Sequence, residues 1–172
     1  MSKKVLVVAP HPDDETLGCG ATLLKHIADG DKVHWLIMTA MPQASGYSEE
    51  QILKREQEIS AVTKAYGFSS CQNLSFKPAK LDLESMSTLV GSVSPYIQKL
   101  KPEIIYLSYR GDVHNDHQIM FDAVISSTKA SRAPFVKRIL TYETLSETDF
   151  NLNPDDRGFI PNVWVDVSAY LS

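Results

Sequence analysis

Lys4–Ala9 reads KVLVVA, a short apolar and β-branched run that stops at Pro10. Such a run predicts a strand that is buried on both faces of a parallel sheet. Apolar residues then recur at helical spacing from Thr16 to Ala28, and Gly30 follows as the expected end of a helix. Because a strand passes directly into a helix here, this stretch indicates the first half of a β-α-β unit.

The rest of the chain continues the alternation of strands and helices. We expect further strands at Val33–Met38, Glu103–Leu107 and Arg138–Thr141, and helices at 48–67, Glu84–Leu100 and Asp116–Ala130. Ser48 and Gln51 fit a capping box, and Pro95 is a candidate break in the helix around it. The pattern predicts one α/β domain with an open, mostly parallel sheet.

Composition limits the size and the class of the protein. The chain has 172 residues, 43% apolar and 22% charged, which is enough for one hydrophobic core and too few for two ordinary domains. A net charge of −4 and the absence of long basic runs argue against a nucleic-acid partner. No apolar stretch reaches the roughly 18 residues of a membrane-spanning helix. Two cysteines and no visible leader sequence predict a cytoplasmic setting.

Two polar clusters follow predicted strands directly. Residues 11–15 read HPDDE and come after the first strand, and residues 112–117 read DVHNDH and come after Glu103–Leu107. Ligands bind beyond the carboxyl ends of strands in open parallel sheets, so we expect the two clusters to meet.

The residue types in these clusters suit a catalytic metal. Zinc in such sites takes three ligands from His and Asp/Glu and leaves a fourth position for water. His11, Asp14 and His117 would fill that role. The prolines that flank His11 restrict the loop, so a ligand there loses little entropy when metal binds. Zinc is the expected ion, although the same ligands accept iron, cobalt or nickel.

The remaining polar residues of the clusters suit the other parts of a hydrolase. Asp13 is our candidate general base, and His114 is our candidate acid or oxyanion donor. We expect Asp116 to hydrogen-bond a histidine and so to set its tautomer. Glu15 is expected to assist the start of the first helix, where the helix dipole favours negative charge.

Both clusters resemble the hallmarks of the zinc-dependent N-acetylglucosaminyl deacetylases, the LmbE-like or PIG-L family. These hallmarks are His-Pro-Asp-Asp-Glu after strand one, here His11–Glu15, and a later His-x-Asp-His, here His114–His117. Further similarity appears at Arg55-Glu56, Glu58, Gly67, Leu81-Asp82, Asp112, Tyr142-Glu143, Ser146, Phe159 and Pro161-Asn162. The resemblance implies a Rossmann-like three-layer sandwich. It also implies hydrolysis of the acetamide of an N-acetylated amino-sugar conjugate to acetate and a free amine.

The resemblance carries the same roles onto the site residues. It implies zinc ligands at His11, Asp14 and His117, a base at Asp13 and an electrophilic histidine at His114. Arg55 becomes a candidate substrate contact.

The resemblance also bears on the extent of the domain. Family members usually continue past a strand that corresponds to Val163–Val167 into a further helical stretch, whereas this sequence ends at Ser172. We therefore expect a single deacetylase domain over residues 1–172 that lacks a carboxyl-terminal segment.

Two other functions remain open at this point. One is a metal-dependent phosphoester hydrolase, which an acidic site with only Arg110 close in sequence disfavours. The other is a sugar- or nucleotide-binding module without catalysis, in which Asp13 would be dispensable. The sequence also leaves open whether the protein is a homo-oligomer.

Other conspicuous residues have structural interpretations. Gly18-Cys19-Gly20 lacks the spacing of a phosphate loop, so we expect close helix-to-sheet packing and a buried Cys19 thiol. No motif surrounds His26 or His34, and both are expected to be surface histidines or structural histidines with satisfied hydrogen bonds.

Overall fold

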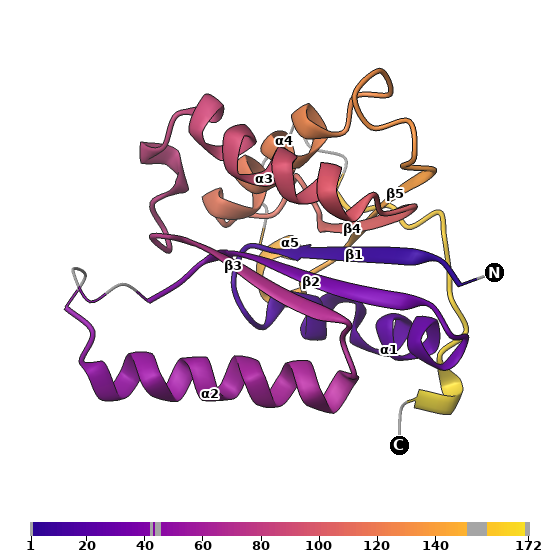
Figure 1. Cartoon of the computed structure of the whole chain (residues 1–172), viewed down its shortest axis with the longest axis horizontal. Coiled ribbons are helices and arrows are strands. Elements are labelled where there is room, and N and C mark those ends of the chain that lie inside the picture. Colours follow the sequence, from indigo (N-terminus) through magenta and orange to yellow (C-terminus); the bar gives the residue numbers. More distant parts are fainter. Residues whose placement is uncertain (1, 42, 44–45, 151–157, 171–172) are drawn as a thin grey trace.

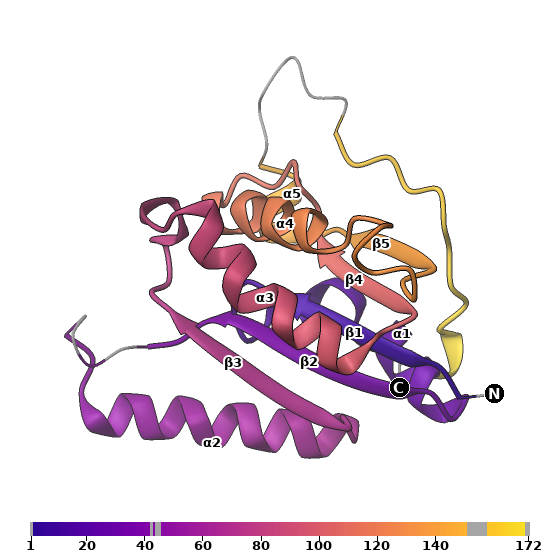
Figure 2. The same ribbon diagram turned by 45° about the horizontal axis from the view of Figure 1, so that its top comes forward.

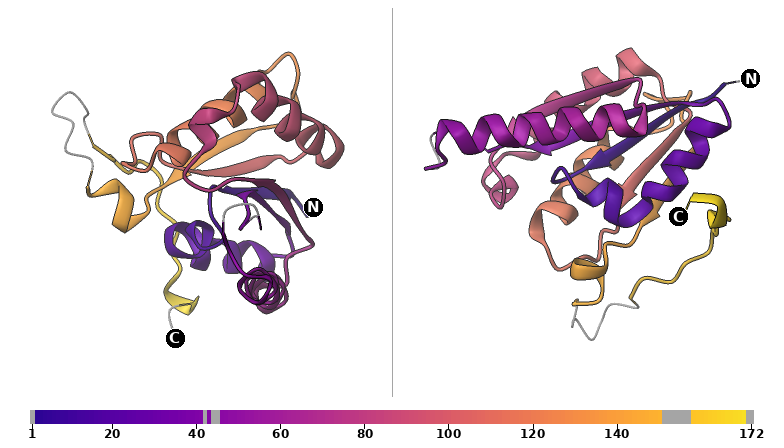
Figure 3. Two further views of the ribbon diagram at one scale, coloured as in Figure 1. Left: turned by 90° about the vertical axis from the view of Figure 1, so that its left-hand side faces the viewer. Right: turned by 90° about the horizontal axis from the view of Figure 1, so that it is seen from below.

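A computed structural model describes residues 2–41, 43, 46–150 and 158–170. Its centre is a sheet of five parallel strands in the order β3-β2-β1-β4-β5. The strands are β1 (Lys4–Ala9), β2 (Lys32–Thr39), β3 (Ser70–Phe76), β4 (Ile104–Ser108) and β5 (Arg138–Tyr142). One face is covered by α1 (Asp14–Ala28) and α2 (Glu49–Tyr66), and the other by α3 (Met86–Leu100) and α4 (Asn115–Ser127) (Figure 1). The end-on view in Figure 3 shows the three layers of the expected sandwich.

The apolar run of β1 supplies both halves of the core. Leu6 and Val8 pack in the cluster beneath α3 and α4, whereas Val5 and Val7 pack in the cluster against α1. All four side chains are fully buried. Successive side chains of a strand point to opposite faces, so a central strand between two helical layers has to be apolar throughout.

The strand order places the two polar clusters beside each other. β1 pairs with β2 on one side and with β4 on the other, so the chain changes direction across the sheet between β1 and β4. A crevice at such a switch point is the usual binding place in open α/β sheets. Both clusters follow these two neighbouring strands.

Several local expectations are confirmed. Ser48 accepts from Gln51 N at 3.2 Å while Ser48 N donates to Gln51 Oε1 at 2.9 Å, which is the predicted capping box. A Cβ on Gly18 would overlap the ring of Tyr142, and one on Gly20 would overlap the Tyr66 hydroxyl, so both glycines permit close packing.

The expected roles of Cys19 and His26 are also confirmed, whereas His34 is satisfied only in part, because its buried Nε2 has no hydrogen-bond partner among the described residues. Burial raises the pKa of the Cys19 thiol well above its ordinary value. His26 hydrogen-bonds Asp31 and Tyr106, and His34 hydrogen-bonds Ser70. As for membrane spans, the described part of the chain contains no helix that has both the length and the hydropathy that a span requires.

The elements differ from the sequence-based predictions at four places. The sequence pattern predicts no strand at β3, and α4 ends at Ser127 rather than at Ala130. α3 runs through Pro95 without a break. Val163–Val167 is not a strand, because it pairs with no strand of the described sheet; this segment and β5 both line a cavity of about 570 Å³. Figure 2 shows the segment passing down the outside of the molecule toward α1.

Candidate metal centre

Three candidate ligands converge at the carboxyl ends of β1 and β4. His11 lies in the loop after β1, Asp14 begins α1 and His117 lies in the first turn of α4. Asp14 Oδ2 is 3.3 Å from His11 Nδ1 and 3.4 Å from His117 Nε2. One ligand atom from each residue lies within 4.8 Å of the others. These separations are long for hydrogen bonds and suit three donors around one ion.

A buried carboxylate stands behind each of the two histidines. Asp112 Oδ2 is 2.7 Å from His117 Nδ1, and Asp116 Oδ2 is 3.1 Å from His11 Nε2. Both aspartates are fully buried. With a metal ion in place, the ring nitrogen that faces the buried aspartate would keep its proton, and the other nitrogen of each ring, which lies near Asp14, would offer its lone pair to the ion. Metal-binding histidines are characteristically held in this way, and the donor set therefore fits a divalent metal ion.

Asp116 is held by the loop that follows β3. It accepts hydrogen bonds from Ala79 N at 2.7 Å and Leu81 N at 3.1 Å as well as facing His11. Burial alone raises the pKa of Asp116, but these contacts outweigh it and bring the pKa below its ordinary value. The histidine partner that we expected for Asp116 is therefore His11, more than a hundred residues away in sequence.

A second trio of residues is also close enough to hold an ion, but its donors are already used. It consists of His11, His114 and Asp116. Asp116 is committed to two backbone N–H groups, and His114 Nδ1 accepts from Asp116 N at 3.1 Å. In the first trio Asp14 Oδ2 also accepts a backbone hydrogen bond, from His11 N at 2.9 Å, but the facing nitrogens of His11 and His117 make no such bond within the described part of the chain, so fewer of its ligand atoms are committed and it is the better candidate.

The electrostatic field at His11 favours positive charge. Burial on its own lowers the pKa of His11, but the contacts with Asp116 and Asp14 outweigh it and raise the pKa to about 9. A position that stabilises a proton so strongly also favours a cation in its place.

His114 lies beside the trio as a neutral donor. It is the N-cap of α4, and its ring centroid is 4.6 Å from that of His11 and 5.3 Å from that of His117. Because Nδ1 accepts from a backbone N–H, the ring proton is on Nε2. Burial and the charge of His11 lower the pKa of His114. Its Nε2–H can therefore donate without the ring being charged.

Comparison with known proteins identifies the family. Residues 6–128 match the model of the PIG-L family, described as GlcNAc-PI de-N-acetylase. This chain belongs to the PIG-L family.

Individual relatives agree with this assignment. The chain is 27% identical to a probable N-acetyl-α-D-glucosaminyl L-malate deacetylase 2 of Bacillus cereus, over 80% of this chain and 66% of that protein. It is 30% identical to the diacetylchitobiose deacetylase of Thermococcus kodakarensis, over 67% of this chain and 45% of that protein. A solved structure of a conserved protein from Thermus thermophilus superposes with a TM-score of 0.70 at 26% identity, covering 82% and 66% of the two chains. These matches span from under half to about two thirds of the relatives' lengths.

A large cavity adjoins the candidate metal centre of this PIG-L chain. It has a volume of about 680 Å³ and lies between α2 and the ends of β2 and β3. His11 and Asp13 line one part of it, and Ile52, Arg55 and Ile59 of α2 form a wall. The cavity gives the centre an approach wide enough for a sugar-sized molecule.

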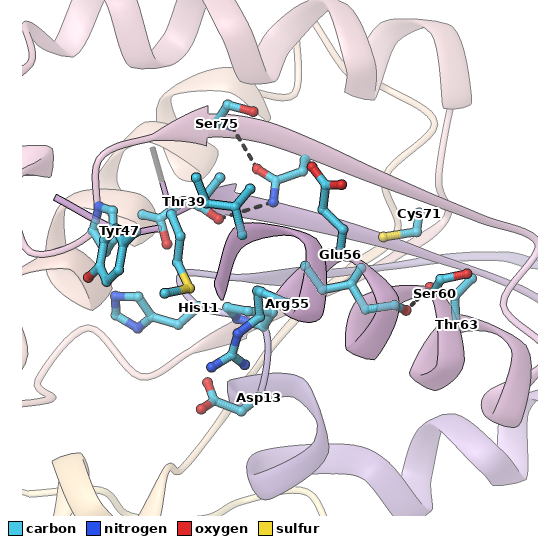
Figure 4. Close-up of a pocket in the computed structure, with 17 residues that line it drawn as sticks. His11, Asp13, Thr39, Tyr47, Arg55, Glu56, Ser60, Thr63, Cys71 and Ser75 are labelled. Carbon is cyan, nitrogen blue, oxygen red and sulfur yellow. Dashed lines mark hydrogen bonds between the residues drawn. The ribbon is translucent and has the colours of Figure 1, made fainter. Parts of the chain in front are cut away.

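Two candidate residues of the cavity lining face each other. Figure 4 shows the guanidinium group of Arg55 directed toward the carboxylate of Asp13. Desolvation by the surrounding chain and the charge of Asp14 raise the pKa of Asp13, while the charges of His11 and Arg55 partly offset this. Arg55 also forms an ion pair with Glu58, with 3.4 Å between Nε and Oε2. Every site residue that the sequence singled out thus lies at the centre or on its cavity.

The sequence did not assign a role to Asp112, and it did not single out Thr148. Asp112 precedes His117 by five residues in a loop, a spacing that gives no helical or strand signal. Thr148 donates to Asp112 Oδ1 across 36 residues of sequence.

Glu15 differs from expectation in its surroundings. It lies in the first turn of α1 as predicted, but it is fully buried, and Oε1 accepts from the Thr16 hydroxyl at 2.7 Å. Burial raises the pKa of Glu15 to about 7. A carboxyl that is partly protonated near neutral pH interacts only weakly with the helix dipole.

Proposed function

We propose that this PIG-L chain hydrolyses the acetamide of an N-acetylglucosamine-type sugar conjugate to acetate and a free amine. His11, Asp14 and His117 would hold one zinc ion for this reaction. The observation that carries the proposal is the convergence of these three side chains, each histidine backed by a buried aspartate, at the end of a sugar-sized cavity. When bound, the ion supplies Lewis-acid activation of water and of the amide carbonyl.

Asp13 is proposed as the general base. Its carboxylate lines the cavity next to His11, and its raised pKa brings it closer to the range in which a carboxylate exchanges protons efficiently. It would take a proton from the attacking water and return it to the departing amine nitrogen.

His114 is proposed to stabilise the developing oxyanion. Its Nε2–H is free of the backbone contact that Nδ1 makes, and the ring stays neutral. A preorganised donor aimed at the carbonyl oxygen contributes most when the negative charge develops there.

Arg55 is proposed to bind the sugar conjugate. It is the one Arg or Lys among the described residues that line the cavity. Arg110, which lies near the second cluster in sequence, pairs with Asp122 at 2.8 Å and 3.1 Å. Because a phosphoester would need several cationic groups, this arrangement favours a neutral amide.

The proposal is tested by measuring bound metal and acetate release together. The substrates would be N-acetylglucosamine, N-acetylglucosaminyl malate and diacetylchitobiose, the last two suggested by the names of the relatives. We expect Asp13→Asn to keep its metal and to lose about 10²- to 10⁴-fold in turnover. Arg55→Ala should raise KM with little change in kcat.

The controls separate the proposed function from its alternatives. Metal analysis of protein purified without added metal identifies the ion among zinc, iron, cobalt and nickel. Turnover by Asp13→Asn at the wild-type rate would contradict the assigned base. Release of phosphate from phosphoesters, with no acetate from any amide, would overturn the proposed reaction.

A further inference from the structure

The loop that carries Asp112 is held from the far side by α5 (Leu145–Thr148), the short helix after β5. Val113 N donates to Glu147 O at 3.0 Å, and Thr148 Oγ1 donates to Asp112 Oδ1 at 2.6 Å. The family match ends at residue 128. These contacts therefore join the metal centre to a part of the chain beyond the matched region.

The direction of each hydrogen bond in this group is determined by its partners. Thr148 Oγ1 accepts from Thr144 N at 2.8 Å. Since a hydroxyl has one hydrogen and the N–H group approaches a lone pair, the hydrogen of Thr148 points to Asp112. The other oxygen of Asp112 faces His117 Nδ1 at 2.7 Å. The chain of contacts thus runs from a backbone amide of the α5 segment to a candidate metal ligand.

All residues in this series of hydrogen bonds are buried. Asp112, His117, Thr144 and Thr148 are each buried in the structure. Hydrogen bonds in such surroundings are electrostatically stronger than in water. A buried carboxylate that loses one of its donors therefore destabilises the folded protein, because water does not replace the lost hydrogen bond.

We propose that Thr148 is a positioning residue for the metal centre, acting on His117 through Asp112. Its hydroxyl holds the Asp112 carboxylate in the orientation that places the proton on His117 Nδ1 and leaves His117 Nε2 directed at Asp14. The inference rests on the proposed metal site. It adds that the affinity of this site depends on α5.

The expected effect is a loss of metal affinity. Without the Thr148 hydroxyl, Asp112 can rotate and the His117 ring is no longer held in one orientation before metal binds. Replacing the carboxylate partner of a metal-binding histidine typically costs about 10- to 100-fold in affinity. Because Thr148 is one residue further out, we expect a change near the lower limit, about tenfold.

The chain offers a matched control in the same segment. Thr144 is 1% exposed, and its Oγ1 has no hydrogen-bond partner among the described residues. Thr144→Val therefore makes the same chemical change as Thr148→Val at another buried position without touching Asp112, whereas Thr148→Val also removes the acceptor of Thr144 N. Thr148→Ser keeps the hydroxyl and serves as the rescue variant.

The test uses metal-free protein of the full chain. Zinc affinity is measured by competition with a chromophoric chelator, and the Tm of each metal-free variant is measured in parallel. We expect about tenfold weaker zinc binding in Thr148→Val, and wild-type affinity in Thr144→Val and Thr148→Ser. The absorption spectrum of the cobalt-substituted protein should change in Thr148→Val alone, because its coordination geometry is disturbed.

The outcomes distinguish this inference from the proposed function. Unchanged zinc affinity in Thr148→Val overturns the inference, even if the Tm falls, because the hydroxyl is then only structural. If Thr148→Val fails to fold, the decision passes to Thr148→Ser, in which zinc binding well below that of Thr144→Val overturns it. A wild type that binds zinc but releases no acetate contradicts the proposed function and leaves the role of Thr148 in place.

Discussion

Two histidines of this chain are each held by a buried aspartate, but at opposite ends of the sheet. His117 Nδ1 is 2.7 Å from Asp112 beyond the carboxyl end of β4, and His26 Nδ1 is 2.8 Å from Asp31 at the start of β2. The two pairs differ at the second ring nitrogen. His26 Nε2 is 2.9 Å from the hydroxyl of Tyr106, whereas His117 Nε2 faces Asp14, which it shares with His11.

The difference shows what distinguishes a metal site from a structural contact. The aspartate–histidine pair is common to both places and sets the tautomer in each. At His26 a hydroxyl satisfies the remaining lone pair, and the group is complete. At His117 the second ring nitrogen lies with His11 around one shared carboxylate, an arrangement that a cation would complete.

Removing each histidine in turn tests directly whether the His117 pair binds metal and the His26 pair only stabilises the fold. His117→Ala should abolish stoichiometric metal binding and lower acetate release by at least about 100-fold, because a ligand is lost outright. His26→Ala should keep the metal and lower the free energy of unfolding by about 1–3 kcal/mol, because Asp31 and Tyr106 lose their shared partner. Metal analysis and urea titration of both variants provide the check. Equal metal loss in the two would show that the comparison is mistaken.

Replacing the aspartates gives a smaller and more selective effect. Asp112→Asn should weaken zinc binding about 10- to 100-fold. Asp31→Asn should leave zinc binding unchanged and cost about 1.5–3 kcal/mol of stability at neutral pH, because a charged hydrogen-bond acceptor is lost.

The stability contribution of Asp31 should also depend on pH. Burial raises the pKa of Asp31, but hydrogen bonds from Lys3 N and His26, together with the charge of Lys3, outweigh it and lower the pKa. A lowered folded-state pKa means that ionised Asp31 stabilises the fold above the unfolded-state value of about 3.9. This stabilisation is lost as the pH falls through the folded-state pKa. A gap between wild type and Asp31→Asn that stays constant from pH 7 to pH 3 would contradict this account.

Tyr106→Phe should have the smallest effect of these substitutions. It frees His26 Nε2 while leaving Asp31 in place, so the His26 pair comes to resemble His117 before other ligands are added. We expect a loss of about 1 kcal/mol of stability from the broken hydrogen bond and no gain of metal. A second metal ion per chain in Tyr106→Phe would mean that one free lone pair suffices, contrary to the interpretation above.

The central part of the fold could be predicted because its sequence pattern is local. β1 matches the expected range, since an uninterrupted apolar run has few alternatives between two helical layers. β3 was missed because its sequence, SCQNLSF, is mostly polar, and as an edge strand it is only partly buried. Val163–Val167 has the composition of a strand, but Trp164 is 76% exposed, and pairing with β5 depends on packing that composition does not determine.

The same distinction applies to the candidate site. His11, Asp13, Asp14, His114 and His117 could be singled out because short motifs at strand ends contain them. The contact between His11 and Asp116, and that between Asp112 and Thr148, join segments that only the sheet order brings together. Sequence spacing contains no information about such contacts, so the residues that hold the histidines were harder to predict than the histidines themselves.

Helix α2 forms one wall of the cavity, yet none of its residues is buried. Its capping box stabilises its start by about 1 kcal/mol, and the left-handed Gly67 ends it. Its apolar side chains Ile59, Val62 and Tyr66 pack on the core only partly buried, so its backbone amides should exchange with deuterium through local opening before those of β1 or β4. The cavity wall can therefore open locally without disturbing β1 and β4, the strands that position the candidate metal ligands.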